Sequence, residues 1–96
     1  MANVIICLDA EIEYTESLIW YSARSESAAT AFDAEFNQAI SEIESDPQRY
    51  PFCDERHQFY LMCRFPFRII YRVTDDTILV VAVAHGSREP NYWTDR

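Results

Sequence analysis

The sequence predicts an α+β domain in which a helical hairpin packs against one face of a mainly antiparallel sheet. Two observations favour this fold. Apolar residues recur every three or four positions in the first half of the chain, the helical period, and every second position in the second half, the strand period. A short β-branched segment precedes the helical half, so the expected element order is β-α-α-β-β-β. The 96 residues suffice for one such domain, residues 1–96.

The first half predicts one short strand and two helices. Residues 3–8 are rich in β-branched side chains and predict a strand. Asp9 is the expected N-cap of a helix whose apolar stripe runs through Ala10, Tyr14, Leu18 and Tyr21. Serines within residues 22–27 interrupt the stripe and can cap a second helix, which Pro47 ends. The acids on both helices are expected to form solvated outer faces.

The second half predicts three consecutive strands. They cover residues 58–64, 67–73 and 77–84, and they are joined by a Phe65-Pro66 corner and an Asp75-Asp76 turn. Residues 77–84 form a continuous apolar run, which is typical of the most buried strand. The predicted core residues come from both helices and this last strand: Leu18, Phe32, Phe36, Ile40, Leu79 and Val81.

Composition excludes several classes of protein. Hydrophobic residues make up 49% of the chain, which is too many for an intrinsically disordered protein. Gly86 is the only glycine, so a glycine-rich phosphate-binding loop is excluded. The longest apolar run has seven residues, far short of a bilayer span. The start has no basic residue before Arg24 and is not expected to be a secretory signal, so a cytoplasmic location without membrane attachment is expected.

The three cysteines are odd in number and widely spaced, which predicts reduced thiols. Cys53, His57 and Cys63 have the spacing C-x3-H-x5-C, but no fourth ligand lies at a standard distance along the chain. We therefore expect no metal site and no cofactor.

Charge is distributed unevenly along the chain. The net charge is −8, and all eight basic residues are arginine. Residues 1–48 carry ten acids and only Arg24, whereas residues 49–96 carry six acids and seven arginines. Because non-specific binding to nucleic acid depends on neutralising phosphates, such a chain is expected to contact an anion only through a local basic strip.

The second half contains the candidate functional residues. Arg68 and Arg72 alternate with apolar residues and should share one strand face, about 13 to 14 Å apart. The tail after the last strand adds His85, Arg88, Tyr92 and Trp93. A purely structural role is the alternative for each of them, as ion pairs with helix carboxylates, as cover for the core or as a hydrogen-bonded strand end. No nucleophile with a base at motif spacing, H-E-x-x-H or G-x-S-x-G motif occurs.

Four segments together resemble the RelE/ParE toxins of type II toxin–antitoxin modules, which include the plasmid-stabilisation type. They are Trp20-Tyr21 with Arg24-Ser25, Asp46-Pro47-x-Arg49-Tyr50-Pro51, Arg64-Phe65-Pro66-Phe67-x-Ile69-x-Tyr71-Arg72-Val73, and Ala82-Val83-Ala84-His85-Gly86-x-Arg88-x-Pro90-x-x-Trp93. The resemblance extends from about residue 10 to the end. It implies the same helical hairpin on an antiparallel sheet, and a cognate antitoxin as partner.

The resemblance implies two possible activities. In the ribosome-dependent mRNA endoribonuclease branch, Arg68, Arg88 and Tyr92 would be the catalytic residues. The lysines of that branch have no counterpart, because Phe59 and Leu61 lie near where they would be expected. Losing a general acid or base costs about 100-fold to 10,000-fold in rate, so nuclease action on ribosome-bound mRNA is disfavoured.

The gyrase-inhibiting branch is resembled more closely, through Tyr21-x-x-Arg24-Ser25 and Trp93. This branch works by binding a protein and needs no catalytic base, so the expected function is that of a ParE-like toxin acting on DNA gyrase. The expected target-binding residues are Arg64, Arg68, Arg72, His85, Arg88, Tyr92 and Trp93. The acidic composition departs from a usually basic family, which keeps open an atypical, non-toxic member with a structural or partner-binding role.

Overall fold

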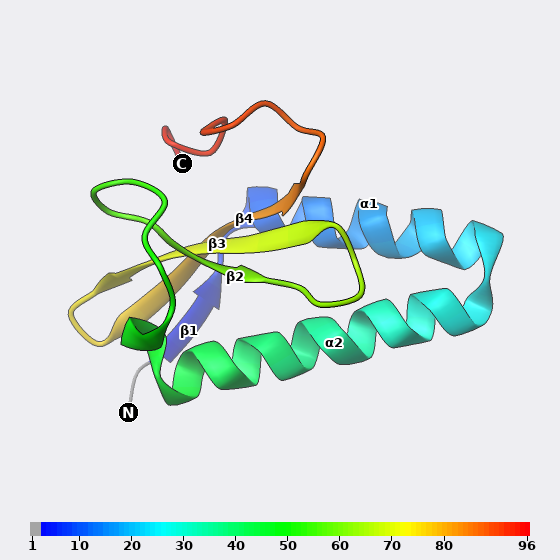
Figure 1. Cartoon of the computed structure of the whole chain (residues 1–96), viewed down its shortest axis with the longest axis horizontal. Coiled ribbons are helices and arrows are strands. Elements are labelled where there is room, and N and C mark those ends of the chain that lie inside the picture. The colour runs from blue at the N-terminus through cyan, green and yellow to red at the C-terminus, as the bar shows by residue number, and fades with distance from the viewer. Residues whose placement is uncertain (1–2) are drawn as a thin grey trace.

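Two antiparallel helices cover one face of a four-stranded sheet, and the C-terminal tail lies on the other side of the sheet (Figure 1). The computed structural model describes residues 3–96. The elements are β1 (Asn3–Ile6), α1 (Leu8–Arg24), α2 (Glu26–Ser45), the 3-10 turn η1 (Pro47–Arg49), β2 (Gln58–Leu61), β3 (Phe67–Thr74) and β4 (Thr77–His85). The order β-α-α-β-β-β and the α+β class confirm the prediction.

The sheet has the strand order β1-β4-β3-β2 and is mainly antiparallel, as predicted. β3 pairs antiparallel with β2 and with β4, while β1 pairs parallel with β4. The β3–β4 turn places Asp75 at φ 53°, a left-handed conformation that aspartate tolerates better than most residues. β1 and β2 are therefore the two edges of the sheet, and both are short.

The helical hairpin differs from the prediction at its first residue and at the break between its two helices. α1 begins at Leu8 with Cys7 as N-cap, so the expected N-cap at Asp9 is wrong. The cause is that the backbone N–H of Cys7 donates to the carbonyl oxygen of Val80, which holds the chain on the sheet up to that residue. The break predicted over residues 22–27 is confined to Ser25, whose hydroxyl accepts the N–H of Ala28 and caps α2.

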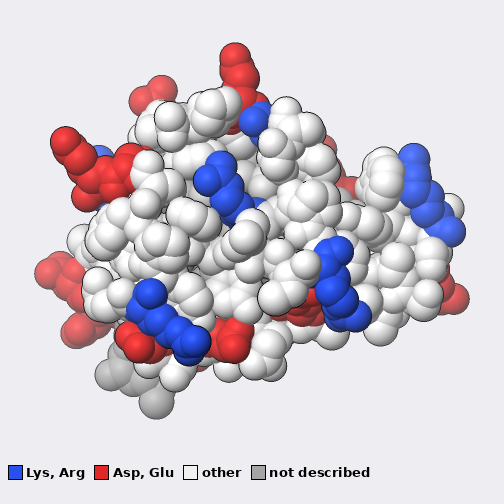
Figure 2. Space-filling view, viewed as in Figure 1, with Lys and Arg blue, Asp and Glu red and all other residues white. Residues whose placement is uncertain are grey.

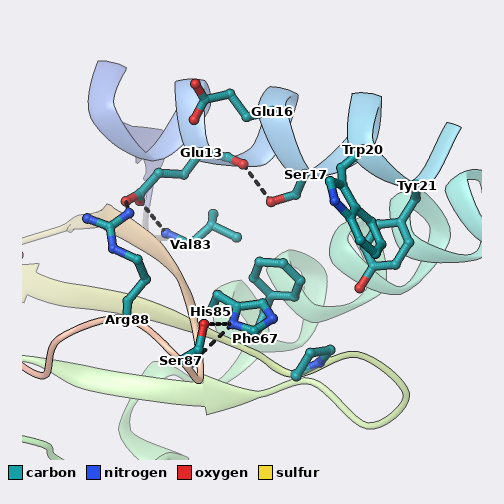
Figure 3. Close-up of a pocket in the computed structure, with 11 residues that line it drawn as sticks. Glu13, Glu16, Ser17, Trp20, Tyr21, Phe67, Val83, His85, Ser87 and Arg88 are labelled. Atoms are coloured by element: carbon teal, nitrogen blue, oxygen red, sulfur yellow. Dashed lines mark hydrogen bonds and ion pairs between the residues drawn. The ribbon is translucent and has the colours of Figure 1, made fainter. Parts of the chain in front are cut away.

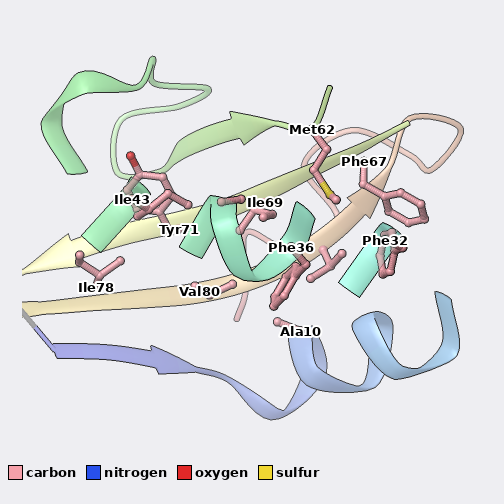
Figure 4. Close-up of a cluster of buried hydrophobic side chains, with 12 residues drawn as sticks. Ala10, Phe32, Phe36, Ile43, Met62, Phe67, Ile69, Tyr71, Ile78 and Val80 are labelled. Carbon is pink, nitrogen blue, oxygen red and sulfur yellow. The ribbon is translucent and has the colours of Figure 1, made fainter. Parts of the chain in front are cut away.

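The main core lies between the hairpin and the sheet (Figure 4). Phe32 and Phe36 of α2 are buried there, as predicted, against inward residues of β3 and β4. Leu18 and Ile40 are half-buried and pack against the same cluster. The ring of Phe36 is 4.4 Å from that of Tyr14 between centroids, so aromatic contacts join the two helices.

A second core covers the opposite face of the sheet, and the prediction did not include it. Its buried residues are Ile70, Val81, Ala82, Ala84 and Trp93. A β-bulge places Ala82 opposite Ile70 and Val80 opposite Tyr71, so Val81 is the extra residue and the alternation of faces is reset there. Leu79 and Val81 share a strand face, as predicted, but that face packs in the second core rather than against the helices. The bulge changes the face only of the residues that follow Val81, so that Ala82 joins Val81 in the second core.

The predicted strand 58–64 is too long, because β2 ends at Leu61. The Glu35 carboxylate of α2 accepts the backbone N–H groups of Cys63 and Arg64, so these residues bond to a helix side chain rather than to a neighbouring strand. Cys63 is exposed. Among residues 3–96, no three His, Cys, Asp or Glu side chains are grouped so as to hold a metal ion. Within the same residues, no helix is long and apolar enough to cross a membrane.

Candidate functional site

The predicted target-binding residues lie in three places. Arg68, Arg72 and Trp93 lie on the sheet face opposite the helices. His85 and Arg88 line a groove beside α1, and Tyr92 joins these two regions. Arg64 lies in the β2–β3 loop, where its Nε is 3.3 Å from Oε1 of Glu35.

Arg68 is held between two aromatic rings. Its guanidinium carbon lies 5.3 Å from the ring centroid of Phe59 and 5.5 Å from that of Trp93. Trp93 is only 1% exposed, so its ring anchors the tail on the second core. Cation–π contacts of this kind hold a guanidinium in place while part of it stays accessible. Arg68 and Arg72 share this sheet face, as the strand alternation predicted.

Arg72 lies on the same sheet face and is held by hydrogen bonds to the tail and to His57. Its Nη1 donates to a main-chain oxygen of Arg96 at 3.2 Å and lies 3.3 Å from Nε2 of His57. Because a guanidinium only donates, Nε2 accepts and the His57 proton lies on Nδ1, 2.9 Å from Asp54. Burial acts to raise the pKa of Asp54, but hydrogen bonds from the backbone N–H groups of Arg56 and His57 hold it below its ordinary value.

Glu13 of α1 is the residue that ties the tail to the body of the domain. Its carboxylate accepts the backbone N–H of Val83 at 2.9 Å, the Tyr92 hydroxyl at 2.7 Å and Nη1 of Arg96 at 2.9 Å. Burial, and then the bond to Glu13, raise the pKa of Tyr92. The expectation that the helix acids are all solvated is therefore wrong for Glu13. Its spacing of three from Ala10 and four from Ser17 places it beside the inward stripe, and that signal could have found it.

An open groove of about 540 Å³ lies between α1 and the ends of β3 and β4 (Figure 3). One wall is apolar and aromatic, formed by Trp20, Tyr21 and Phe67. His85 stands against this wall, with its ring edge-on to Phe67 and centroids 5.0 Å apart. Its Nδ1 accepts the N–H and the hydroxyl of Ser87, so the ring has a fixed orientation.

Arg88 and two acids form the polar side of the groove. Nη1 of Arg88 is 3.9 Å from Glu13, and its guanidinium carbon is 4.1 Å from the Tyr92 ring centroid. Glu16 also lines the groove. Because Arg88 is more than half exposed, this long ion pair contributes little to stability and leaves the guanidinium accessible. The groove thus combines an aromatic wall with accessible charges of both signs.

Basic side chains are separated on the surface rather than merged. In Figure 2 they stand apart on a mostly uncharged face, with acidic groups gathered toward its periphery. A smaller pocket, of about 350 Å³, is an exception, because Arg56 and Arg72 both line it, together with Glu55. Dispersed arginines beside exposed aromatic and apolar side chains are typical of protein-binding surfaces.

The residues implied for nuclease chemistry do not converge on one point. Arg68 contacts the Trp93 ring, Trp93 contacts Tyr92, and Tyr92 contacts Arg88, so two aromatic rings stand between the two guanidiniums. The Tyr92 hydroxyl is already bonded to Glu13. The two positions where the endoribonuclease branch would have lysines carry no cation, since Phe59 packs beside Arg68 and Leu61 is an exposed aliphatic residue. This arrangement supports binding better than proton transfer.

Known proteins resemble this chain in sequence and in fold. Residues 12–90 match the family model described as the ParE toxin of the type II toxin–antitoxin system parDE. A solved structure of the chromosomal ParDE TA system from P. aeruginosa superimposes with a TM-score of 0.77 at 14% sequence identity, over 88% of this chain and 96% of that one. At that identity the likeness shows the fold alone. None of the curated proteins matches the chain.

Proposed function

This chain belongs to the ParE toxin family of type II toxin–antitoxin systems, and from that premise we propose that it is a toxin that binds DNA gyrase and is neutralised by a cognate antitoxin. We favour a binding protein over an enzyme because of where Arg68 and Arg88 lie. Each guanidinium is held against aromatic rings, and the two do not face a common centre. A protein-binding surface needs rigid, accessible anchors of this kind, whereas phosphodiester cleavage needs convergent cations.

His85 and Arg88 are the residues we propose to contact the target from the groove, and Arg68 and Arg72 from the opposite sheet face. Tyr92 and Trp93 act in this proposal by fixing the tail between the two regions, because Trp93 is buried and Tyr92 is bonded to Glu13. Arg64 extends the surface along the β2–β3 loop.

The test is induction of this chain without its partner, followed by assays on purified components. We expect growth arrest with DNA damage, inhibition of gyrase supercoiling, and intact mRNA on translating ribosomes. Cleavage of ribosome-bound mRNA would replace the gyrase proposal with the ribonuclease function. A folded protein that neither cleaves mRNA nor inhibits gyrase would instead be a non-toxic member of the family.

Arg88→Ala is the most informative single variant for this assay. Since Arg88 is exposed and its ion pair is long, its removal should weaken gyrase inhibition about tenfold without lowering the melting temperature. Arg49→Ala is the matched control, because Arg49 is an exposed arginine in η1 that does not line the groove. Arg68→Ala is less informative, because it also removes contacts that pack Trp93.

A further inference from the structure

The outer face of α1 carries exposed aliphatic side chains that the fold does not use. Leu8, Ile12 and Ile19 are 71%, 45% and 63% exposed. Their spacings of four and seven residues put them on one side of the helix, away from the side of Ala10 and Tyr14, which packs on the core. We call these three residues the outer α1 stripe. Large apolar side chains aligned along a solvent-facing helix mark an interaction surface more often than single exposed ones do.

Acidic residues without partners flank the outer α1 stripe. Helical spacing puts Glu11 on one side and Glu16 on the other, and both are exposed. Neither forms an ion pair with any residue of 3–96, whereas the inward Glu13 is paired with Arg96. The stripe is therefore an apolar track with negative charge on both edges.

The outer α1 stripe is continuous with the groove. Glu16, on one edge of the stripe, lines that groove, and so does Trp20, which follows Glu16 by one helical turn on the same side. Trp20 is 52% exposed, and its ring is held by the guanidinium of Arg24, whose central carbon lies 3.6 Å from the ring centroid. An exposed tryptophan fixed in this way is a suitable anchor for a partner that crosses from the stripe into the groove.

The negative charge of Glu11 and Glu16 determines which kind of partner can bind the outer α1 stripe. A second copy of the chain would place Glu11 and Glu16 against the same acids, in a pair of molecules that each carry a net charge of −8. We propose instead that the outer α1 stripe binds an amphipathic helix whose apolar side faces the stripe and whose edges carry Lys or Arg. This inference rests on the proposed toxin–antitoxin function, and it assigns such a basic helix to the antitoxin.

A pair of synthetic peptides tests the chemistry with the purified chain alone. Both are about 18 residues, or ~27 Å, long as helices, and both carry Leu along one face. One carries Lys along both edges and the other carries Glu. Titration calorimetry should show at least about tenfold tighter binding of the basic peptide, with a difference that shrinks as salt rises. Equal affinities, or no binding of either peptide, would overturn the proposal.

Variants on α1 test the position. Because its side chains are exposed, Ile12→Gln/Ile19→Gln should keep the melting temperature and lose about tenfold or more in affinity for the basic peptide. Glu11→Lys/Glu16→Lys should reverse the preference between the peptides. Leu61→Gln, an equally exposed aliphatic residue on β2, is the control and should bind normally. A dimer of the unmodified chain that Ile12→Gln/Ile19→Gln abolishes in sedimentation would show that a second copy occupies the stripe.

A growth assay separates failure of this inference from failure of the proposed function. We expect the Ile12→Gln/Ile19→Gln chain to arrest growth like the unmodified chain, but to escape relief by its co-expressed cognate antitoxin. If relief is unchanged, the stripe assignment is wrong while the toxin function stands. If the unmodified chain does not arrest growth, the proposed function fails, whatever the peptides show.

Discussion

Glu13 connects three parts of the chain through one carboxylate. The Glu13 side chain extends from α1 and accepts the backbone N–H of Val83 in β4. It also accepts hydrogen bonds from the Tyr92 hydroxyl and the Arg96 guanidinium of the tail. A charge this buried is tolerated only when its oxygen atoms are fully bonded, and here they are. The residue therefore determines how closely the tail, which carries Tyr92 and Trp93, follows the sheet.

Glu13→Ala should destabilise the domain by about 2 to 4 kcal/mol, because it leaves the N–H of Val83 and the Tyr92 hydroxyl without their acceptor and removes the carboxylate that pairs with Arg96. The free energy of unfolding in urea measures the loss. Glu11→Ala, two residues away on the exposed side, should stay within about 0.5 kcal/mol of the unmodified chain. Equal losses in the two variants would mean that the Glu13 contacts contribute nothing to stability.

At the scale of elements, the hairpin is fixed to the sheet chiefly by the aromatic residues of α2. Phe32 and Phe36 are buried, and their rings contact Tyr14 and Tyr21 of α1. The same contacts place Tyr21 beside Trp20 in the groove wall, with ring centroids 5.0 Å apart. Packing in the core and the shape of the candidate site therefore depend on the same helix pair.

Phe36→Ala should cost about 3 to 5 kcal/mol, since it removes a buried ring and leaves a cavity between the helices and the sheet. The melting temperature and the unfolding midpoint both report this loss. Gln38→Ala, on the exposed side of α2, should leave both nearly unchanged. A near-neutral Phe36→Ala variant would show that the α2 stripe is not the one that packs on the core.

Local periodicity was enough to predict the helices and the two long strands. The repeat that identifies β3 or α2 is contained in its own residues, so no other segment is needed to recognise it. The change of faces after Val81 was not predictable in this way, because the bulge depends on the pairing of β4 with β3. The early end of β2 also depends on a distant residue, Glu35 of α2.

The sequence names candidate residues for the site but does not give their arrangement. Arg68 and Arg72 were expected on one strand face and the other candidates on the tail, but the sequence did not show that the two groups lie on different sides of the sheet. What separates them is the path of the tail, which is set by burial of Trp93 and by the bonds from Tyr92 and Arg96 to Glu13. These contacts span up to 83 positions in the sequence, so no local pattern contains them.

Over the whole molecule, several carboxylates of the helical hairpin accept hydrogen bonds from tyrosine hydroxyls. The hydroxyls of Tyr14, Tyr60 and Tyr92 donate to Asp33, Glu42 and Glu13, respectively. Tyr60 thereby fastens β2 to α2, and Tyr92 fastens the tail to α1. The excess negative charge of the first half is thus partly structural, while Glu11 and Glu16 remain on the surface.

This arrangement predicts a loss of stability at alkaline pH. Five tyrosines have raised pKa values: Tyr14, Tyr21, Tyr60, Tyr71 and Tyr92. Burial is the main cause in four of them, and the bond to Glu42 is the main cause for Tyr60. In the unfolded chain a tyrosine ionises near pH ~10. Above that pH the unfolded state therefore holds fewer protons than the folded one, and the stability contributed by each group is present below pH ~10 and falls as the pH rises further.

The free energy of unfolding should therefore decline from about pH 9.5 upward, by at most about 1.4 kcal/mol per pH unit for each of these tyrosines. Tyrosinate absorbance should rise together with unfolding rather than before it. Tyr60→Phe keeps the ring but removes the proton and its bond to Glu42, so this variant should lose stability at pH 8 and decline less steeply above pH ~10. Tyrosines that all titrate near pH ~10 while the circular dichroism stays native would contradict the prediction, because their hydroxyls would then be free to ionise in the folded domain.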